Sequence, residues 1–207
     1  MDEYLQATDI IDWQHPQILE LAQQLARGRD DPEAIAKVCF EWVRDRIRHS
    51  CDYQMNPVTC KASEVLEFGT GFCFAKSHLL AALLRANSIP TGFCYQRLSI
   101  DDRGAPYSFH GFNAVYLPDF GWYRIDARGN KKGVNAQFSP PTRQLAYTPC
   151  LSGEFEFDRI FAAPLPVIIE ALQTYSTWNE MLEHLPDIFS EDKSDRIWKN
   201  SQEIVEN

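Results

Sequence analysis

The chain is organised around one short stretch, Gly69-Thr70-Gly71-Phe72-Cys73-Phe74-Ala75-Lys76-Ser77-His78-Leu79-Leu80. Two glycines before Cys73 allow a tight turn, and the residues after it are largely apolar as far as Leu84. This clustering predicts a buried helix with Cys73 in its first turn. The unpaired N–H groups and the positive dipole end of a helix start favour an anion, so we expect Cys73 to ionise more easily than a free cysteine of pKa about 8.5. Cys73 is therefore a candidate nucleophile.

Two residues further along the chain fit the other roles that a thiolate nucleophile needs, a base and a group that orients the base. His110 opens a predicted strand at 110–117, and Asp126 closes another at 122–126, after a turn at 118–121. The three side chains can converge if these strands pair as a hairpin and the Cys73 helix packs across them. The spacing permits that arrangement.

Three blocks of the sequence resemble the transglutaminase-like superfamily. They are Gly71-Phe72-Cys73 entering a helix, His110-Gly-Phe-Asn-Ala-Val on a strand, and Trp122-Tyr-Arg-Ile-Asp126-Ala-Arg-Gly-Asn130. Their order and separation match that family from about Ile35 to Asn130. The resemblance implies a papain-like core with a Cys-His-Asp triad, in which Cys73 is the nucleophile, His110 the base and acid, and Asp126 the group that orients His110.

A triad of this kind also needs donors for the oxyanion that forms during acyl transfer. The backbone N–H of Cys73 is one expected donor, because it lies at a helix start. In papain-like enzymes a side chain upstream of the nucleophile supplies the second donor, and here Gln54 and Asn56 are the candidates. A plain loop role is the alternative for both.

Composition limits the class of protein and its partners. The chain has 207 residues, 44% hydrophobic and 24% charged, which is typical of a soluble globular domain. A net charge of −9 argues against nucleic acid or an anionic membrane as the main partner. The resemblance implies a peptide or protein substrate. The N-terminus lacks a basic start followed by an apolar run, and we expect a cytoplasmic location. The oligomeric state is left open.

Cysteine and histidine usage does not predict a metal site. Six cysteines are spread through the chain and need not form a disulfide framework, so we expect them to be reduced. His49, Cys51 and Cys60 lack the paired Cys-x-x-Cys spacing of a zinc site. The chain is also too short for the additional β-domains of large animal transglutaminases and their calcium site. We therefore expect neither a metal nor another cofactor.

The rest of the pattern predicts an α+β fold in which N-terminal helices, including the nucleophile helix, pack on an antiparallel sheet. Helices are expected at 17–26 and 32–47, the second capped by Asp31, with a loop at 48–57 and a short helix at 63–66. A further strand is expected at 92–100. After a linker at 139–141 we expect a mostly helical extension, with a strand at 155–161 and helices at 164–172 and from Thr177 to near Pro186. A charged tail is expected from Ser190. Its candidates for docking on the rest of the protein are Ile197, Trp198, Ile204 and Val205. We interpret residues 1–207 as one domain, with a core at about 31–138 and an extension at 139–207.

The predicted activity is cysteine-dependent acyl transfer or hydrolysis on peptide or amide substrates, including glutamine carboxamides, through a thioester acyl-enzyme. The sequence does not distinguish a protease from an amidase or a transglutaminase. A noncatalytic protein-binding module that keeps the fold is the alternative, and the retained triad counts against it. A third hypothesis is that residues 140–207 cover the cleft and make the enzyme latent.

Overall fold

The computed structural model describes residues 1–187, so the predicted docking residues Ile197, Trp198, Ile204 and Val205 lie outside the described part. The N-terminal half contains a 3₁₀ turn η1 (Asp2–Leu5), helices α1 (Pro16–Ala26), α2 (Pro32–Arg46), α3 (Ser50–Tyr53), α4 (Ala62–Phe68) and α5 (Cys73–Ala86), and the short strands β1 (Arg48–His49) and β2 (Thr70–Gly71). The second half contains strands β3 (Thr91–Ser99), β4 (Tyr107–Leu117), β5 (Gly121–Ile125), β6 (Gln137–Ser139), β7 (Thr142–Gln144) and β8 (Phe155–Glu156), and helices α6 (Pro166–Thr174) and α7 (Trp178–Glu183).

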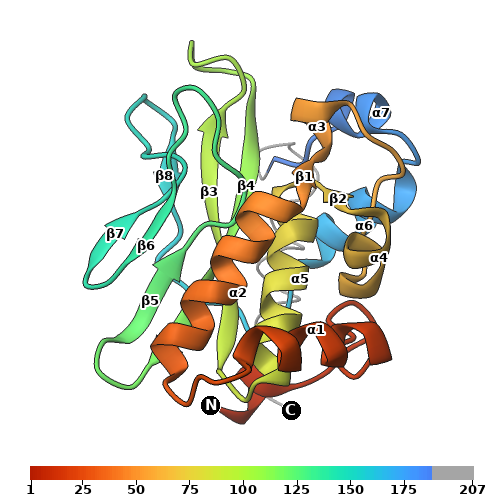
Figure 1. Cartoon of the computed structure of the whole chain (residues 1–207). Helices are drawn as coiled ribbons and strands as arrows, with labels where there is room; N and C mark the ends of the chain where they lie inside the picture. The colour runs from red at the N-terminus through yellow and green to blue at the C-terminus, as the bar shows by residue number, and fades with distance from the viewer. Residues whose placement is uncertain (188–207) are drawn as a thin grey trace.

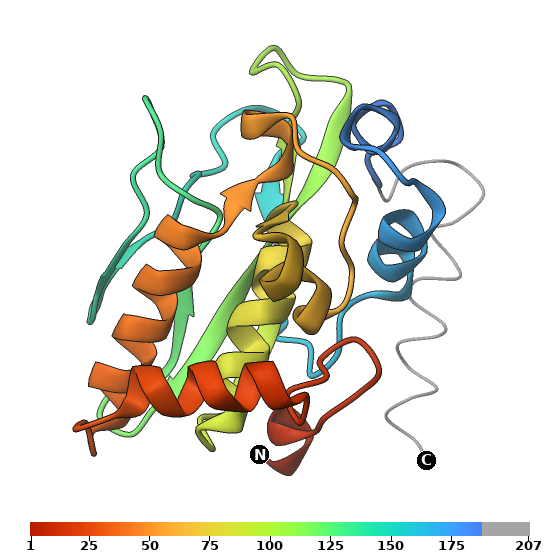
Figure 2. The ribbon, with the colours of Figure 1, turned by 45° about the vertical axis from the view of Figure 1, so that its right-hand side comes forward.

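Helix α5 is the centre of the molecule. Every residue from Cys73 to Arg85 is buried. A helix that is apolar on all sides is stable only when other elements surround it. Figures 1 and 2 show α5 against the strands of the sheet, with α1, α2 and α4 on its other side. The structure thus confirms a buried helix that begins at Cys73.

The main sheet places the strands that carry the candidate site next to each other. Its order is β5-β4-β3-β8, and all neighbouring strands are antiparallel. His110 on β4 pairs with Gln96 on β3, and Asn113 on β4 pairs with Ile125 at the end of β5. The β4–β5 hairpin therefore brings Asp126, the residue after β5, alongside the middle of β4. This arrangement of helices on an antiparallel sheet is the predicted α+β fold.

Two predicted helix starts are confirmed by their hydrogen bonds. The carboxylate of Asp31 accepts hydrogen bonds from the N–H groups of Glu33 and Ala34 at the start of α2. At the start of α7, the carboxylate of Glu180 accepts the backbone N–H of Thr177 at 3.1 Å, which is the Glu180 half of the expected capping box. Both helix starts are marked by residues within three positions of each other, so they can be predicted from the sequence without knowledge of the tertiary structure.

Three predictions for connecting segments were wrong. Residues 48–53, expected within a loop, form β1 and α3, and β1 pairs in parallel with β2. Ser139, Pro140 and Pro141, interpreted as a linker, lie at the turn of the β6–β7 hairpin. The strand expected at 155–161 is shorter, because β8 ends at Glu156 and only Phe161 pairs again, with Phe93. Strand pairing between distant segments decides the first and the third, whereas the second is a local hairpin with Pro140 and Pro141 at its turn.

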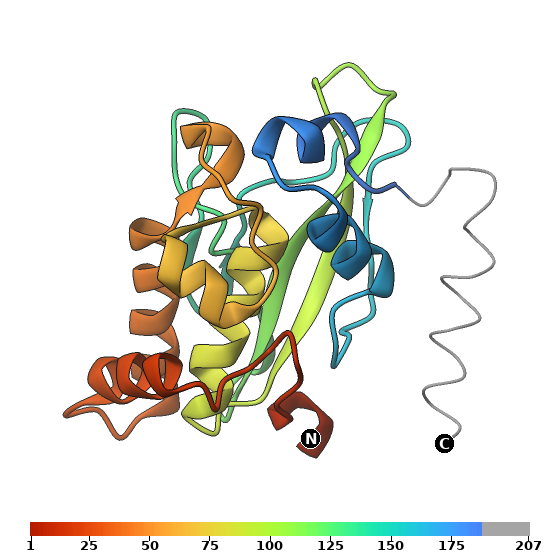
Figure 3. The ribbon, with the colours of Figure 1, turned by 90° about the vertical axis from the view of Figure 1, so that its right-hand side faces the viewer.

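The segment after β8 packs back onto the core. Figure 3 shows α7 beside α3, at the end of the molecule where α5 begins. The guanidinium of Arg97 forms a bidentate ion pair with Asp187, with N–O distances of 2.7 Å, and the N–H of Phe109 donates to the carbonyl of Pro186. These contacts hold the end of the described chain against β3 and β4. Within residues 1–187, no helix combines the length and the apolar character needed to cross a membrane.

Candidate active site

Cys73 is the first residue of α5, as the sequence predicts. The preceding residue, Phe72, has an extended backbone, and no side chain caps the helix start. The first N–H groups of a helix have no partner within the helix, so they point outward from this end. The thiol is thus placed where backbone donors and the positive end of the helix dipole converge.

His110 and Asp126 form a buried pair on neighbouring strands. Nε2 of His110 lies 2.7 Å from Oδ2 of Asp126. The same carboxylate accepts hydrogen bonds from the N–H of Arg128 at 3.1 Å and from the N–H of Ala146 at 3.0 Å. Burial alone raises the pKa of Asp126, but His110 and these hydrogen bonds outweigh it and hold the pKa below its usual range. Asp126 is therefore a carboxylate that fixes the orientation of the imidazole.

The side chain of Cys73 lies near the His110 ring, and the two residues line the same cavity. Burial lowers the pKa of His110, but the negative charges of Asp126 and Cys73 and the hydrogen bond to Asp126 raise it to about 10. The site thus favours the imidazolium form of His110.

Cys73 and His110 open into one cavity of about 710 Å³. One side is cationic and contains Arg128, Lys131 and Lys132. Another side is apolar and is formed by Leu98, Ile100, Phe109, Leu182 and Leu185. Since Leu182 and Leu185 belong to α7 and the residues after it, the C-terminal segment supplies part of the cavity wall.

The cationic side is organised by Asp52, from α3. Its carboxylate binds Arg128 through both terminal nitrogens, one at 3.0 Å, and also accepts from Nζ of Lys131 at 2.7 Å. Burial raises the pKa of Asp52, but its hydrogen bonds with Arg128 and Lys131 lower it to about 2. One carboxylate thus pairs with two of the three cations that line the cavity, and Asp102 and Glu154 line the cavity as well.

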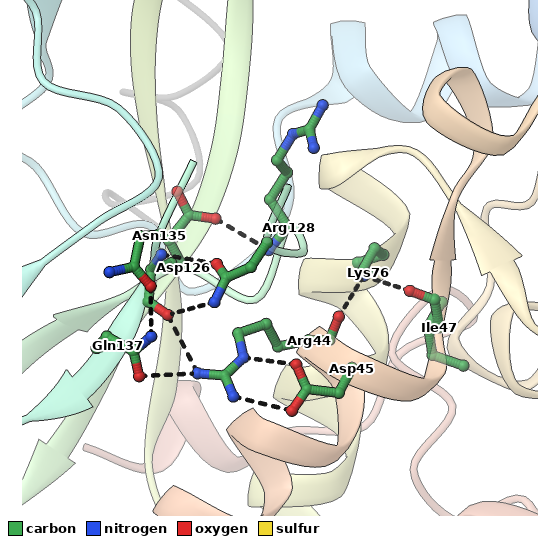
Figure 4. A network of polar contacts seen from close by, with 10 residues as sticks. Arg44, Asp45, Ile47, Lys76, Asp126, Arg128, Asn135 and Gln137 are labelled. Atoms are coloured by element: carbon green, nitrogen blue, oxygen red, sulfur yellow. Dashed lines mark hydrogen bonds and ion pairs between the residues drawn. The ribbon is translucent and has the colours of Figure 1, made fainter. Parts of the chain in front are cut away.

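A second network fixes the start of α5 relative to α2. Lys76, one turn after Cys73, is fully buried, and its Nζ donates to the carbonyls of Ile47 and, at 3.3 Å, Arg44 (Figure 4). The guanidinium of Arg44 also binds Asp45 and Gln137. Burial lowers the pKa of Lys76 to about 7. These bonds tie the C-terminal end of α2 both to α5 and to the start of β6.

The two residues predicted as oxyanion donors do not share the cavity. Gln54 is exposed, ends α3 in the left-handed conformation and is not among the lining residues. Asn56 is also exposed, and its side-chain oxygen accepts the N–H of Trp178 at the start of α7. The structure gives Asn56 a contact that holds α7, away from Cys73.

Some residues of the site have no clear sequence signal. The ring of Tyr147 packs edge-to-face on His110, with centroids 5.0 Å apart, and the N–H of Ala146 binds Asp126. His49 lines the cavity from β1. These residues come from segments far from the triad in sequence, and only folding reveals them. No three His, Cys, Asp or Glu side chains gather as metal ligands anywhere in residues 1–187.

The comparison with protein families identifies the class. The model described as the transglutaminase-like superfamily matches residues 19–127, slightly more than half of the chain. The chain therefore belongs to the transglutaminase-like superfamily. A search of curated proteins found no match.

Solved structures of similar fold are distant in sequence. A candidate cysteine protease from Cytophaga hutchinsonii is 18% identical, with a TM-score of 0.48 over 60% of this chain and 40% of that one. The periplasmic domain of TgpA from Pseudomonas aeruginosa is 19% identical, with a TM-score of 0.44 over 60% of this chain and 45% of that one. This chain thus spans less than half the length of either structure.

Proposed function

We propose that this protein is a cysteine-dependent acyl-transfer enzyme that acts on peptide or amide carbonyl groups, with Cys73 as nucleophile, His110 as acid and base, and Asp126 as the group that orients His110. One observation carries the proposal: the imidazole of His110 is hydrogen-bonded to the buried Asp126 carboxylate at 2.7 Å, and it shares a cavity with Cys73 at the start of α5. Nucleophile, base and orienting group in this order are the general requirement for covalent catalysis.

The chemistry begins with the Cys73 thiolate. Its sulfur attacks the carbonyl carbon of the substrate, and the carbonyl oxygen becomes an oxyanion in a tetrahedral intermediate. The N–H of Cys73, at the uncapped start of α5, is placed to donate to this oxygen. His110 then gives its proton to the leaving amine as the C–N bond breaks, which leaves a thioester on Cys73.

A second half-reaction resolves the thioester. Neutral His110 takes a proton from a water molecule or an amine, and that nucleophile attacks the thioester carbonyl and releases the Cys73 thiolate. Water produces a carboxylic acid, and an amine produces a new amide. Asp126 keeps Nδ1 of His110 directed toward the sulfur in both half-reactions, because it holds Nε2 at 2.7 Å.

An acyl-trapping experiment tests the proposal. The purified chain is incubated with p-nitrophenyl acetate, and the acetylated residue is mapped by mass spectrometry. We expect a hydroxylamine-sensitive acetyl group on Cys73 that is absent in Cys73→Ala and forms much more slowly in His110→Ala. Cys150→Ala, which removes an exposed cysteine, is the matched control and should react like the wild type. The absence of an acetyl-thioester at Cys73 in the wild type contradicts the proposal.

The same preparation separates hydrolysis from transfer. Glutamine-containing peptides are added with and without a primary amine such as glycine ethyl ester, and the products are identified by mass. A free acid indicates hydrolysis or deamidation, whereas a new amide indicates transfer. If Cys73 is acetylated at the expected rate but neither product forms, glutamine-containing peptides are not acyl donors for this enzyme.

A further inference from the structure

His49 is a buried polar residue of the cavity, and its side chain makes no hydrogen bond within residues 1–187. It is only 8% exposed, and it lines the same cavity as Cys73 and His110. Nδ1 is enclosed and has no hydrogen-bond partner, and no hydrogen bond within residues 1–187 involves Nε2. Burying an imidazole without hydrogen bonds costs free energy. A ring of this kind beside a nucleophile therefore calls for a functional explanation.

The backbone fixes this ring next to the turn that leads into Cys73. In the parallel β1–β2 pair, His49 is the partner of Gly71, two residues before the nucleophile. The ring also packs edge-to-face on Phe72, with centroids 5.9 Å apart. His49 is thus positioned by the same short strand pair that delivers Cys73 to the start of α5.

The strand that carries His49 is braced from both ends. Lys76 on α5 donates to the carbonyl of Ile47, two residues before His49 (Figure 4). After His49, the hydroxyl groups of Ser50 and Thr70 are hydrogen-bonded at 3.1 Å. An oxyanion donor must be held rigidly, because its contribution depends on being aligned before charge develops. His49 meets that requirement.

The charges around His49 keep its ring neutral. Burial and the nearby positive charges of Arg128, Lys76 and His110 lower the pKa of His49 well below its ordinary value, and Asp52 opposes them only in part. A neutral imidazole has one N–H and one bare nitrogen. A buried N–H without an acceptor is rarer than a buried acceptor without a donor, so enclosed Nδ1 is the bare nitrogen. The N–H is then on Nε2, the ring nitrogen that is not enclosed.

We propose that His49 is the second oxyanion donor of this site, and that its Nε2–H and the backbone N–H of Cys73 together bind the oxygen of the tetrahedral intermediate. The inference rests on the proposed acyl-transfer function and assigns to His49 the role that the sequence suggested for Gln54 or Asn56. The hydrogen bond forms with the substrate oxygen as it becomes negative, and no proton leaves His49. A neutral imidazole is suited to this task, since it polarises a carbonyl without acting as an acid.

Two variants with opposite hydrogen-bonding capacity test the proposal. His49→Phe keeps a flat ring against Phe72 but has no donor. His49→Gln presents an amide N–H close to the former position of Nε2. Each is compared with the wild type for acetylation of Cys73 by p-nitrophenyl acetate, for turnover of a glutamine-containing peptide, and for alkylation of Cys73 by iodoacetamide. Circular dichroism and urea unfolding check that each variant folds.

Alkylation separates a role of His49 in oxyanion binding from a role in positioning or activating Cys73, because the displacement of iodide creates no oxyanion. We expect His49→Phe to alkylate within about twofold of the wild type but to acylate about 100- to 1000-fold more slowly, the usual cost of losing one oxyanion donor. His49→Gln should recover most of the acylation rate through kcat rather than KM. If His49→Phe acylates like the wild type, or loses alkylation and acylation equally, His49 is not an oxyanion donor. A wild type whose Cys73 alkylates readily but never acylates refutes the proposed function and this inference with it.

Discussion

The backbone of Gly111 lies directly against the ring of Phe74. A Cβ atom at position 111 would stand only 2.6 Å from Cδ1 of Phe74. Gly111 follows His110 on β4, and Phe74 follows Cys73 on α5. The contact therefore sets how closely the helix that begins at Cys73 approaches the strand that carries His110, and only glycine permits this approach.

Gly111→Ala should push the start of α5 away from β4. We expect it to lower the free energy of unfolding by about 1–3 kcal/mol through overpacking. Because catalytic geometry is sensitive to displacements of about 1 Å, we also expect alkylation of Cys73 by iodoacetamide to slow by at least about tenfold. Gly28→Ala is the control: Gly28 has a φ of +73° and open space around it at the end of α1, so its cost is backbone strain alone. Equal labelling rates in the two variants would show that the Gly111 contact does not position Cys73.

The charge of His110 should be visible by nuclear magnetic resonance. The imidazole nitrogens of His110 should stay protonated up to a pKa of about 10, while His78, with a pKa of about 4, is neutral near pH 7. Asp126→Asn removes the carboxylate charge, so the pKa of His110 should move toward its ordinary value of about 6.5. Asp45→Asn, at a carboxylate that pairs with Arg44, should leave the titration of His110 unchanged. A His110 that titrates near 6.5 in the wild type contradicts the charge arrangement described above.

Two buried bases give opposite pH dependences of stability. His110 has a raised pKa, so its stabilisation is fully present below about pH 6.5 and is lost as the pH rises through about 10. Lys76 has a pKa lowered from 10.5 to about 7, so the unfolded chain binds more protons in that interval and the free energy of unfolding rises with pH. The two slopes oppose each other between about pH 7 and 10 in the wild type.

Lys76→Met should expose the His110 contribution. We expect its free energy of unfolding, measured with urea, to fall as the pH rises from about 6.5 to about 10, by at most about 1.4 kcal/mol per pH unit. The double variant Lys76→Met/His110→Gln should lose this fall. A slope that is the same in the single and double variants would assign the pH dependence to other groups.

The ion pair of Asp52 with Arg128 should contribute more to the free energy of unfolding than the ion pair of Asp52 with Lys131. The Arg128 side chain is 6% exposed, so Asp52→Asn leaves a buried cation without its counter-ion and should cost about 1–3 kcal/mol in urea unfolding near pH 7. The Lys131 side chain is 46% exposed, and Lys131→Met should cost less than about 1 kcal/mol. A cost for Lys131→Met that equals or exceeds that of Asp52→Asn would contradict this order.

Tyr147 should support His110 through its ring rather than its hydroxyl. Tyr147→Ala removes the edge-to-face contact and should slow alkylation of Cys73 about 3- to 10-fold, in line with the energy of an aromatic pair. Tyr147→Phe keeps the ring and should react like the wild type. If Tyr147→Phe is as slow as Tyr147→Ala, the hydroxyl is the important group.

Much of the fold could be predicted because its signals are local. The apolar run after Cys73 requires a central helix, Asp31 and the Thr177/Glu180 pair mark helix starts, and the alternating residues around His110 and Asp126 form neighbouring strands. Short elements such as β1 and the β6–β7 hairpin were missed. Strands of two or three residues are too short to show a periodicity, and the partner of β1 lies more than twenty residues away in the chain.

The sequence by itself determined the superfamily, the central helix, and the order of Cys73, His110 and Asp126, because each depends on neighbouring residues or on a family pattern. Only the tertiary structure decided what surrounds them: Tyr147 and Ala146 on the His110–Asp126 pair, α7 in the cavity wall, and His49 rather than Gln54 or Asn56 beside the nucleophile. The physical reason is that a side chain's surroundings depend on long-range packing and pairing, and the pairing of β1 with β2 brings His49 opposite Gly71 across a sequence separation that no local pattern encodes.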